Sequence, residues 1–193
     1  MLVEIVVICI LAKLKHLKLS LLFRTWTFYP ILLAQLALAV FQASIFLRVY
    51  LFLPAVPYTE MAVILSFLFA VVTFRLYGPA MVGSACVVAG TLLNKAVIAQ
   101  NAGKMPVFPT LSYLTGYVTP DMLSSVDSIH SMGDAGTRLP FLADYIDYGY
   151  SILSPGDLLI HLFACILFFE LIRAVNRRYG TGDTQRKLEE TAQ

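Results

Sequence analysis

The sequence has few charged residues for its length. Only 13% of its 193 residues are Asp, Glu, Lys or Arg, whereas 59% are hydrophobic and the mean hydropathy is +0.77. A soluble domain is usually about a quarter charged and about half apolar. The shortage of charge therefore excludes a disordered chain, a coiled coil, a collagen and an ordinary cytosolic enzyme. The composition predicts a small membrane protein with several spans.

Other features are also scarce. The net charge is only +2 and no block of Lys and Arg is present, so we expect no nucleic-acid partner. The three cysteines, Cys9, Cys86 and Cys165, lie in apolar runs without the spacing of a metal site or a disulfide framework. No common catalytic, nucleotide-binding or haem motif occurs. We therefore predict buried free thiols, no metal and no cofactor. The lack of a basic segment before the first apolar stretch argues against a secretory signal peptide.

Five apolar segments are candidate transmembrane helices, at residues 2–12, 29–52, 58–76, 79–98 and 158–175. The first would be only about 16 Å long as a helix, against a hydrocarbon core of roughly 30 Å. It either spans with the help of the leucines and lysines that follow, or dips into the bilayer. The sequence predicts an all-α integral membrane protein, with one domain at residues 1–178 and a polar, flexible cytoplasmic tail at 179–193.

The distribution of Lys and Arg predicts the orientation. With five spans, ten of the fourteen basic residues fall on one side of the membrane: Lys13, Lys15, Lys18, Arg24, Arg75, Arg173, Arg177, Arg178, Arg186 and Lys187. The other four are Arg48, Lys95, Lys104 and Arg138. Because cytoplasmic loops carry the excess of basic residues, the N-terminus is predicted outside and the C-terminus in the cytoplasm.

A long loop at residues 100–156 is predicted on the outer side. It is rich in tyrosine and apolar residues, which indicates a cap lying at the membrane surface. Within it, Thr119 and Pro120 suit the start of a helix, and apolar residues then recur at helical spacing as far as Ile129. We predict an amphipathic helix that stops at the glycine-containing turn of residues 133–136.

Parts of this loop resemble a known pattern. It comprises Asn94, residues 101–107 (NAGKMPV), His130, residues 137–144 (TRLPFLAD) and residues 154–157 (SPGD). Together they resemble a bacterial family of small multi-spanning membrane proteins of unknown function, and the similarity covers most of the chain. In that family position 102 is often glycine, so Ala102 departs from the pattern. The resemblance implies a multi-pass fold in the bacterial cytoplasmic (inner) membrane, and it brings no established activity.

Four polar residues in or next to the loop are candidates for chemistry. On a helix, Asp127 and His130 would share a face, so His130 is a candidate general base or metal ligand; the alternative is a solvated pair or a helix cap. Asp157 and His161 are four residues apart at the start of the fifth span. Asp157 suits a helix cap better than a catalyst. For His161, a packed hydrogen-bonded side chain and a functional group are equally open.

Basic and small residues supply further candidates. Lys104 and Arg138 could contact an anion, with Gly103 beside Lys104 allowing close approach of the backbone. Alternatively, they pair with loop aspartates and tie the loop down. Within the fourth span, Gly83, Gly90 and Asn94 fall on one helical stripe, which is typical of a helix-packing seam.

The leading hypothesis is a non-catalytic membrane subunit or binding protein with a capped outer pocket for a partner or an amphipathic ligand, a lipid or a quinone. The predicted pocket residues are Lys104, His130, Arg138, Asp144 and His161, and the predicted structural residues are Asn94, Asn101, Gly103, Pro106 and Asp157. Predicted partners are membrane lipids and a larger membrane complex. The alternative is an enzyme on lipid-linked or headgroup substrates, with His130 as base and Lys104 or Arg138 on a phosphate. A third hypothesis, a solute transporter, depends on the few polar residues within the spans, namely Gln35, Gln42, Ser84, Thr91 and Asn94.

Overall fold

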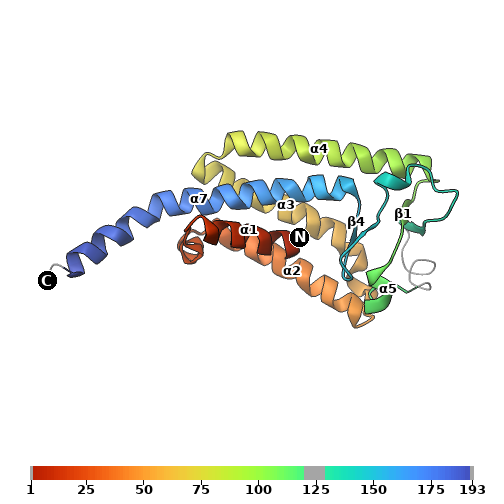
Figure 1. Cartoon of the computed structure of the whole chain (residues 1–193), viewed down its shortest axis with the longest axis horizontal. Helices are drawn as coiled ribbons and strands as arrows, with labels where there is room; N and C mark the ends of the chain where they lie inside the picture. Colours follow the sequence, from red (N-terminus) through yellow and green to blue (C-terminus); the bar gives the residue numbers. More distant parts are fainter. Residues whose placement is uncertain (1, 120–128, 192–193) are drawn as a thin grey trace.

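Long helices make up most of the protein (Figure 1). The computed structural model describes residues 2–119 and 129–191, and the side chains of these residues except 50, 53–54, 56–57 and 181–191. The long helices are α1 (Leu2–Leu14), α2 (Phe28–Phe46), α3 (Val56–Phe74), α4 (Tyr77–Gln100) and α7 (Pro155–Thr191). Two short 3-10 helices, η1 (Leu19–Arg24) and η2 (Tyr50–Ala55), connect α1 to α2 and α2 to α3. The predicted all-α class is confirmed.

Three of the described helices are long and apolar enough to cross a membrane. They are Phe28–Phe46, Tyr77–Gln100 and the Pro155–Gly180 part of α7. The apolar part of α3, Tyr58–Phe74, is shorter. The 13 residues of α1 extend about 20 Å at 1.5 Å per residue. The chain is therefore a membrane protein, and three of its helices meet the length and composition of a span.

Each predicted apolar segment contains a helix, but one predicted boundary is wrong. Residues 29–52 do not form a single helix, because α2 ends at Phe46. Arg48, two residues later, has a φ of +58°, a left-handed conformation that a right-handed helix cannot continue through. Arg75 has a similar φ of +54° directly after α3, and this residue starts the turn into α4. Left-handed residues thus set the ends of two helices in places that hydropathy does not reveal.

The central element of the bundle is α7. It contacts α1, η1, α3 and α4, and Figure 1 shows it lying between α4 and the α1–α2 pair. Its side chains Leu167, Leu171, Ile172 and Val175 are fully buried in the main apolar core. Because α4 and α1 contact different sides of α7, Asp157 faces Asn94 of α4, whereas His161 faces Glu4 of α1.

The loop region, residues 101–154, connects α4 to α7 and contains two small sheets. The strands β1 (Met105–Val107) and β2 (His130–Met132) pair in parallel, and β3 (Ile146–Asp147) and β4 (Ile152–Leu153) form an antiparallel hairpin. The short helices α5 (Leu111–Thr115) and η3 (Pro140–Leu142) lie between the strands. An isolated bridge from Val107 to Asp144 joins the two halves of the region. Figure 1 shows the loop region gathered at one end of the bundle.

The predicted amphipathic helix of the loop is only partly within the structure. Residues 120–128, with Asp127, lie outside the described residues. The prediction that His130 lies on a helix is wrong, because residues 130–132 form β2 with Met105 opposite His130. The N–H of Met105 also donates to the carbonyl of Ile129 at 3.0 Å. A partner strand distant in sequence therefore overrides the local helical pattern.

The predicted flexible tail is helical in its backbone as far as Thr191. Figure 1 shows this end of α7 projecting beyond the other helices. The tail contains good helix formers such as Gln, Arg, Lys, Leu and Glu. Since adding residues to an existing helix avoids the cost of nucleation, the buried part of α7 can extend into a polar segment.

Candidate functional site

The helices α4 and α7 approach each other at three glycines. A Cβ on Gly83 would lie 2.8 Å from the Phe163 ring, and a Cβ on Gly90 would collide with the carbonyl oxygen of Gly156. A Cβ on Gly156 would in turn lie 2.7 Å from the carbonyl oxygen of Gly90 and collide with the side chain of Asn94. The stripe of small residues predicted on α4 therefore faces α7, and it leaves no room for a ligand between the two helices.

Asn94 and Asp157 meet at the loop end of this contact. The Asn94 amide donates to Asp157 Oδ1 at 2.8 Å and accepts from the Ser154 hydroxyl at 2.9 Å. Asp157 Oδ2 accepts from the N–H of Ser154 at 2.9 Å, while the N–H of Asp157 donates to Ser154 Oγ at 2.9 Å. This reciprocal pattern is a capping box at the start of α7. It places Asp157 in a structural role, closing the helix end and joining it to α4.

Asn101 connects the end of α4 to a distant part of the loop region. Its amide oxygen accepts from the N–H of Arg138 and its amide nitrogen donates to the Arg138 carbonyl, both at 2.9 Å. The same nitrogen also donates to the carbonyl of Val97. A side-chain amide that satisfies both backbone groups of one residue fixes residue 138 against the helix end.

The turn after Asn101 runs through the left-handed region. Ala102 has a φ of +55° and Gly103 a φ of +79°. A residue with a Cβ is disfavoured there, which gives a physical reason for glycine at position 102. Beyond the turn, the buried Pro106 in β1 accepts a hydrogen bond at its carbonyl from the N–H of Asp144 at 3.0 Å. Gly103 and Pro106 therefore shape the path of β1.

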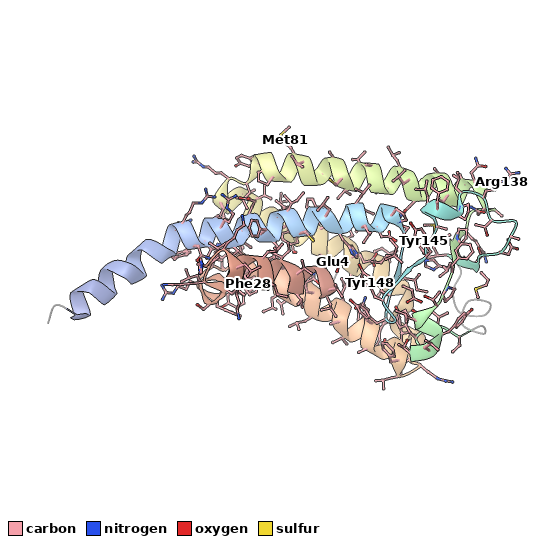
Figure 2. The ribbon with its side chains drawn as sticks, viewed as in Figure 1. Glu4, Phe28, Met81, Arg138, Tyr145 and Tyr148 are labelled. Carbon is pink, nitrogen blue, oxygen red and sulfur yellow. The ribbon has the colours of Figure 1, made fainter. Side chains whose placement is uncertain are left out.

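Lys104 and Arg138 are exposed. Within the described part of the chain, neither forms an ion pair with a carboxylate, and the Arg138 guanidinium donates to Gln100 Oε1 at 3.3 Å. Figure 2 shows Arg138 at the far tip of the loop region, well away from Glu4. These two cations are thus positioned at the surface of the loop region.

His130 and Asp144 come together within the loop region. His130 Nε2 lies 3.6 Å from Asp144 Oδ2, with the Asp144 side chain 5% exposed and the His130 side chain 35% exposed. The parallel pairing of β1 with β2 and the bridge from Val107 bring the two residues to the same place. A buried carboxylate beside a partly exposed imidazole can orient the ring.

Asp147 organises the half of the loop region nearest the helices. One carboxylate oxygen accepts from the N–H groups of Thr110 and Ser112 at 2.7 and 2.8 Å, and the other from the Ser112 hydroxyl and the N–H of Gly149 at 2.5 and 2.7 Å. Partial burial alone would raise the pKa of Asp147, but these hydrogen bonds outweigh it and hold the pKa below its ordinary value. Asp147 was not among the predicted residues, because Thr110 and Ser112, which donate to it, lie 37 and 35 positions earlier in the chain.

Glu4 and His161 make a hydrogen-bonded contact between two helices. Glu4 is in the first turn of α1 and His161 is in the second turn of α7, and His161 Nδ1 lies 2.8 Å from Glu4 Oε1. Their side chains are 15% and 13% exposed, respectively. Ionisable side chains at such sites in membrane proteins are costly and often functional. The presence of Glu4 in the first apolar segment was the one sequence signal that could have identified this partner.

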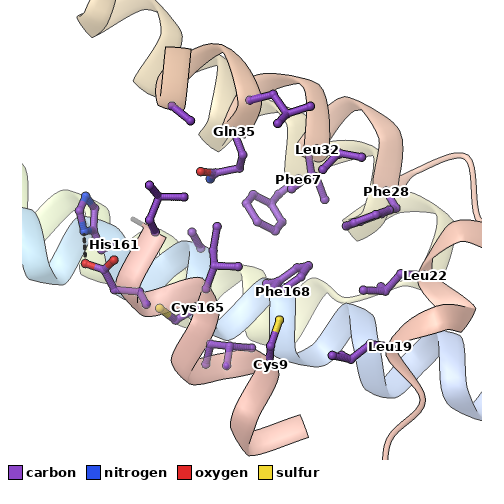
Figure 3. A pocket seen from close by; sticks show the side chains of 18 of the residues that line it. Cys9, Leu19, Leu22, Phe28, Leu32, Gln35, Phe67, His161, Cys165 and Phe168 are labelled. Atoms are coloured by element: carbon purple, nitrogen blue, oxygen red, sulfur yellow. Dashed lines mark hydrogen bonds and ion pairs between the residues drawn. The ribbon is translucent and has the colours of Figure 1, made fainter. Parts of the chain in front are cut away.

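A cavity of about 340 Å³ lies next to this pair (Figure 3). Its walls come from α1, η1, α2, α3 and α7, and nearly all of the lining side chains are apolar. The polar exceptions are Glu4, Gln35 and His161. Figure 3 shows Gln35 and His161 toward one end of the cavity, with Phe28 and Leu22 toward the other. The surface of the cavity is therefore almost entirely apolar, with the Glu4–His161 contact beside one end.

Further polar groups surround the Glu4–His161 pair. Glu60, an exposed residue of α3, is close enough to Asp157 and His161 to interact with both electrostatically. From the hairpin of β3 and β4, Tyr148 and Tyr150 lie near Glu4, and Figure 2 shows Tyr148 beside it. Burial raises the pKa of both phenols, and the Glu4 carboxylate raises them further. The tyrosines consequently stay neutral and can donate hydrogen bonds near this end of the cavity.

The five residues predicted to line one pocket lie in three places. His130 and Asp144 form a pair in the loop region, His161 joins Glu4 beside the cavity, and Lys104 and Arg138 are at the surface. Among the described residues, no three His, Cys, Asp or Glu side chains are grouped as metal ligands. The cavity beside the half-buried Glu4–His161 pair is thus formed by the helices, and of the five predicted residues His161 lines it.

Comparison with protein families gives one match. The model of a family of unknown function, DUF5317, matches residues 19–169. The chain belongs to this family. The expected resemblance to an uncharacterised family is confirmed at that level, while the motif pattern that suggested it stays a prediction. The family match includes the loop region and most of the cavity walls, but not α1 with Glu4. No curated protein and no solved structure matches the chain.

Proposed function

We propose that this DUF5317 protein is a non-catalytic, integral membrane binding protein for an amphipathic ligand, a lipid or a quinone. The observation that carries the proposal is the cavity of about 340 Å³ among α1, α2 and α7, which is almost entirely apolar and lies beside the Glu4–His161 contact. Cavities of this size and character are typical of small-molecule sites. An apolar tail would lie between α1 and α2, and a polar head would face the ion pair.

The proposed setting is the bacterial cytoplasmic membrane, with five spans and the loop region outside. The turn from α1 to η1 and the turn from α3 to α4 carry Lys13, Lys15 and Arg75, and they lie at the opposite end of the bundle from the loop region (Figure 1). This separation agrees with cytoplasmic placement of the basic end. The head of the ligand would then lie toward the outer surface, below the β3–β4 hairpin with Tyr148 and Tyr150.

The proposal predicts that filling the cavity blocks binding. Ala39 lines the cavity from α2, whereas Ala43, one turn further along the same helix, does not line it and is exposed. Native mass spectrometry of protein purified in mild detergent should show a bound amphiphile on the wild type. Ala39→Phe should reduce its occupancy by about tenfold or more, because the phenyl ring takes the volume needed by the chain.

Ala43→Phe is the matched control and should bind as the wild type does, because it adds the same ring outside the cavity. Equal loss of the amphiphile in both variants would indicate a general change in lipid contact and would contradict the proposal. A wild type with no bound amphiphile under conditions in which the helices stay folded would also contradict it.

A second candidate is the enzyme on lipid-linked or headgroup substrates. The observation that favours it is the His130–Asp144 pair, in which a buried carboxylate faces a histidine accessible at the loop surface. This candidate requires His130→Ala to abolish a cellular function while expression and folding are retained. The binding protein proposed above predicts that His130→Ala leaves the amphiphile occupancy unchanged. The transporter hypothesis and the membrane complex stay predictions.

A further inference from the structure

The end of the bundle opposite the loop region carries many basic side chains. The turns from α1 to η1 and from α3 to α4 lie there (Figure 1), and the later part of α7 contacts η1 and the last turn of α3. Of the acidic side chains that the structure describes, Glu170 is the one at this end, and it is paired with Arg173 at 2.6 Å. This end therefore has an excess of positive charge. We call it the basic surface, and it comprises the exposed residues Lys13, Lys15, Lys18, Arg24, Arg75, Arg173, Arg177 and Arg178.

The turn that follows α1 has a defined geometry. The N–H of His16 donates to the carbonyl of Lys13, and the N–H of Leu17 donates to the carbonyl of Ala12, both at 2.9 Å. His16 has a φ of +56°. These two hydrogen bonds around a left-handed residue form a Schellman motif, which ends a helix. The backbone between Lys13 and Lys18 is therefore held in one conformation.

Two contacts with α7 hold the lysines of this turn in place. The N–H of Lys18 donates to Asn176 Oδ1 at 2.8 Å, and the Asn176 amide nitrogen donates to the carbonyl of Lys18 at 3.2 Å. Lys15 Nζ lies 5.8 Å from the centre of the Phe169 ring, within the range of a cation–π interaction. Among the described residues, neither lysine forms an ion pair with a carboxylate. Both ammonium groups can therefore bind an anion from outside the bundle.

Large apolar side chains are exposed beside these cations. Leu14, Phe23 and Trp26 each expose more than half of their surface. The Trp26 ring packs edge-on against Phe69 of α3, with the ring centres 5.4 Å apart. Tryptophan is enriched at the boundary between the membrane and water. A partner that matches this surface needs both an anionic group and an apolar part, which a free phosphate ion or a nucleic acid does not provide.

We infer that the basic surface binds anionic phospholipids, with the lipid phosphate at Lys15 and Lys18 and the acyl chains beside Leu14 and Trp26. A lysine ammonium binds phosphate as a point charge, and each basic residue near an anionic leaflet adds to the attraction. A zwitterionic headgroup is a poorer match, because its own ammonium group would meet the same lysines. Neither lysine lines the cavity, so this inference goes beyond the proposed function and does not depend on it.

The experiment compares two lipids that have the same acyl chains and different headgroups. The full-length protein in mild detergent is titrated with dioleoyl phosphatidylglycerol, which is anionic, or dioleoyl phosphatidylcholine, which is zwitterionic, and native mass spectrometry gives the dissociation constants. Phosphatidylglycerol should bind roughly tenfold more tightly, a ratio of the size that one or two charge contacts give. Free glycerol 3-phosphate in large excess should not displace it, because that anion lacks the acyl chains.

Substitutions then assign the preference to the basic surface. Lys15→Gln combined with Lys18→Gln should reduce the preference to less than about twofold. Lys15→Arg combined with Lys18→Arg keeps both charges and should bind as the wild type does. Arg48→Gln combined with Lys95→Gln is the matched control, because it removes the same charge from two exposed residues outside the basic surface.

Three results would overturn the inference. The first is equal affinity of the wild type for the two lipids, and the second is displacement of phosphatidylglycerol by glycerol 3-phosphate. The third is an equal loss of preference in the Lys15–Lys18 glutamine variant and in the Arg48–Lys95 control, which would assign the preference to the net charge of the protein.

The substitution Ala39→Phe separates this inference from the proposed function. Ala39 lines the cavity and lies outside the basic surface, so Ala39→Phe should leave the preference for phosphatidylglycerol unchanged. If Ala39→Phe abolished that preference, the anionic lipid would be bound in the cavity and the inference would be wrong. If Ala39→Phe kept the preference but had no effect on the co-purified amphiphile, the proposed function would fail and the inference would stand.

Discussion

The two sides of α7 are packed in opposite ways. Toward α4, Gly90 and Gly156 bring the backbones so close that a single added methyl group would collide with the other helix. Toward α1 and α2, large apolar side chains such as Phe28 and Phe168 leave a cavity of about 340 Å³. Protein interiors are normally close-packed, and unfilled apolar space is destabilising. The contrast shows that the α4 side of α7 is closely packed, whereas the α1–α2 side contains unfilled apolar space.

The same contrast appears in the polar residues at the start of α7. Asp157 is satisfied within the protein by Asn94 and Ser154. His161, four residues later, instead reaches Glu4 at the edge of the cavity. Asp157 therefore serves as a helix cap, whereas His161 borders the cavity.

The largest expected change in stability comes from a substitution on the α4 side of α7, where the two helices are in close contact. Gly156→Ala would place a Cβ against the Asn94 side chain and 2.7 Å from the carbonyl oxygen of Gly90. The free energy of unfolding, measured by titration with denaturing detergent in mixed micelles, should fall by about 2–4 kcal/mol because the two backbones must separate. Gly78→Ala is the control: nothing lies within 4 Å of that site on α4, so stability should be unchanged or slightly higher. If Gly156→Ala were as stable as the wild type, α4 and α7 could not be in such close contact at Gly90 and Gly156.

A smaller effect is expected in the loop region above the cavity side. Asp147→Asn should lower the local stability around α5 and the hairpin by about 1–3 kcal/mol, because an amide cannot accept all the hydrogen bonds that the carboxylate accepts. Amide hydrogen exchange at Thr110, Ser112 and Gly149, corrected for intrinsic rates, measures this change. Asp134→Asn is the control, because Asp134 is exposed and contacts only the turn at residues 136–137.

The lowered pKa of Asp147 sets the sign of its pH dependence. Because the folded pKa is below that of the unfolded chain, the contribution to stability is complete above the unfolded pKa of about 4 and is lost as pH falls through the folded value. Protection of the three amides in the wild type should therefore decline only below about pH 4, and Asp147→Asn should lack this step. A step of the same size in Asp147→Asn would assign it to another group.

The smallest change in stability is expected for a large substitution on the α1–α2 side of α7, where the cavity lies. Ala39→Phe adds a ring to the cavity wall, and we expect the free energy of unfolding to change by less than about 1 kcal/mol, because space for the ring exists. The same detergent titration checks this, with the exposed Ala43→Phe as control. A loss as large as that of Gly156→Ala would show that this side is as tightly packed as the α4 side.

The sequence predicted the helices well, because long apolar runs leave few alternatives. It also indicated the small-residue stripe of Gly83, Gly90 and Asn94, since helical spacing alone places these residues on one face. It failed at the end of α2, where left-handed Arg48 stops the helix without a glycine or proline. His130 was assigned to the wrong element because its β partner, Met105, is 25 positions away.

The candidate site was less predictable than the fold for the same reason. His161 was identified as a candidate, but Glu4, 157 positions earlier, was not connected to it. The expected convergence of Lys104 and Arg138 with the histidines relied on their shared loop, and a loop can direct its side chains to opposite surfaces. A cavity formed by four helices and a 3-10 helix depends on side-chain volumes in three dimensions, which no local pattern in the sequence reports.

The most direct test is an experimental structure of the wild-type protein in discs of its native membrane. If the cavity binds an amphiphile as proposed, we expect elongated density between α1 and α2, with its polar end within hydrogen-bond distance of His161 or Gln35. A structure in which the side chains of α1 and α2 meet directly and fill this space, with no bound amphiphile, would contradict it.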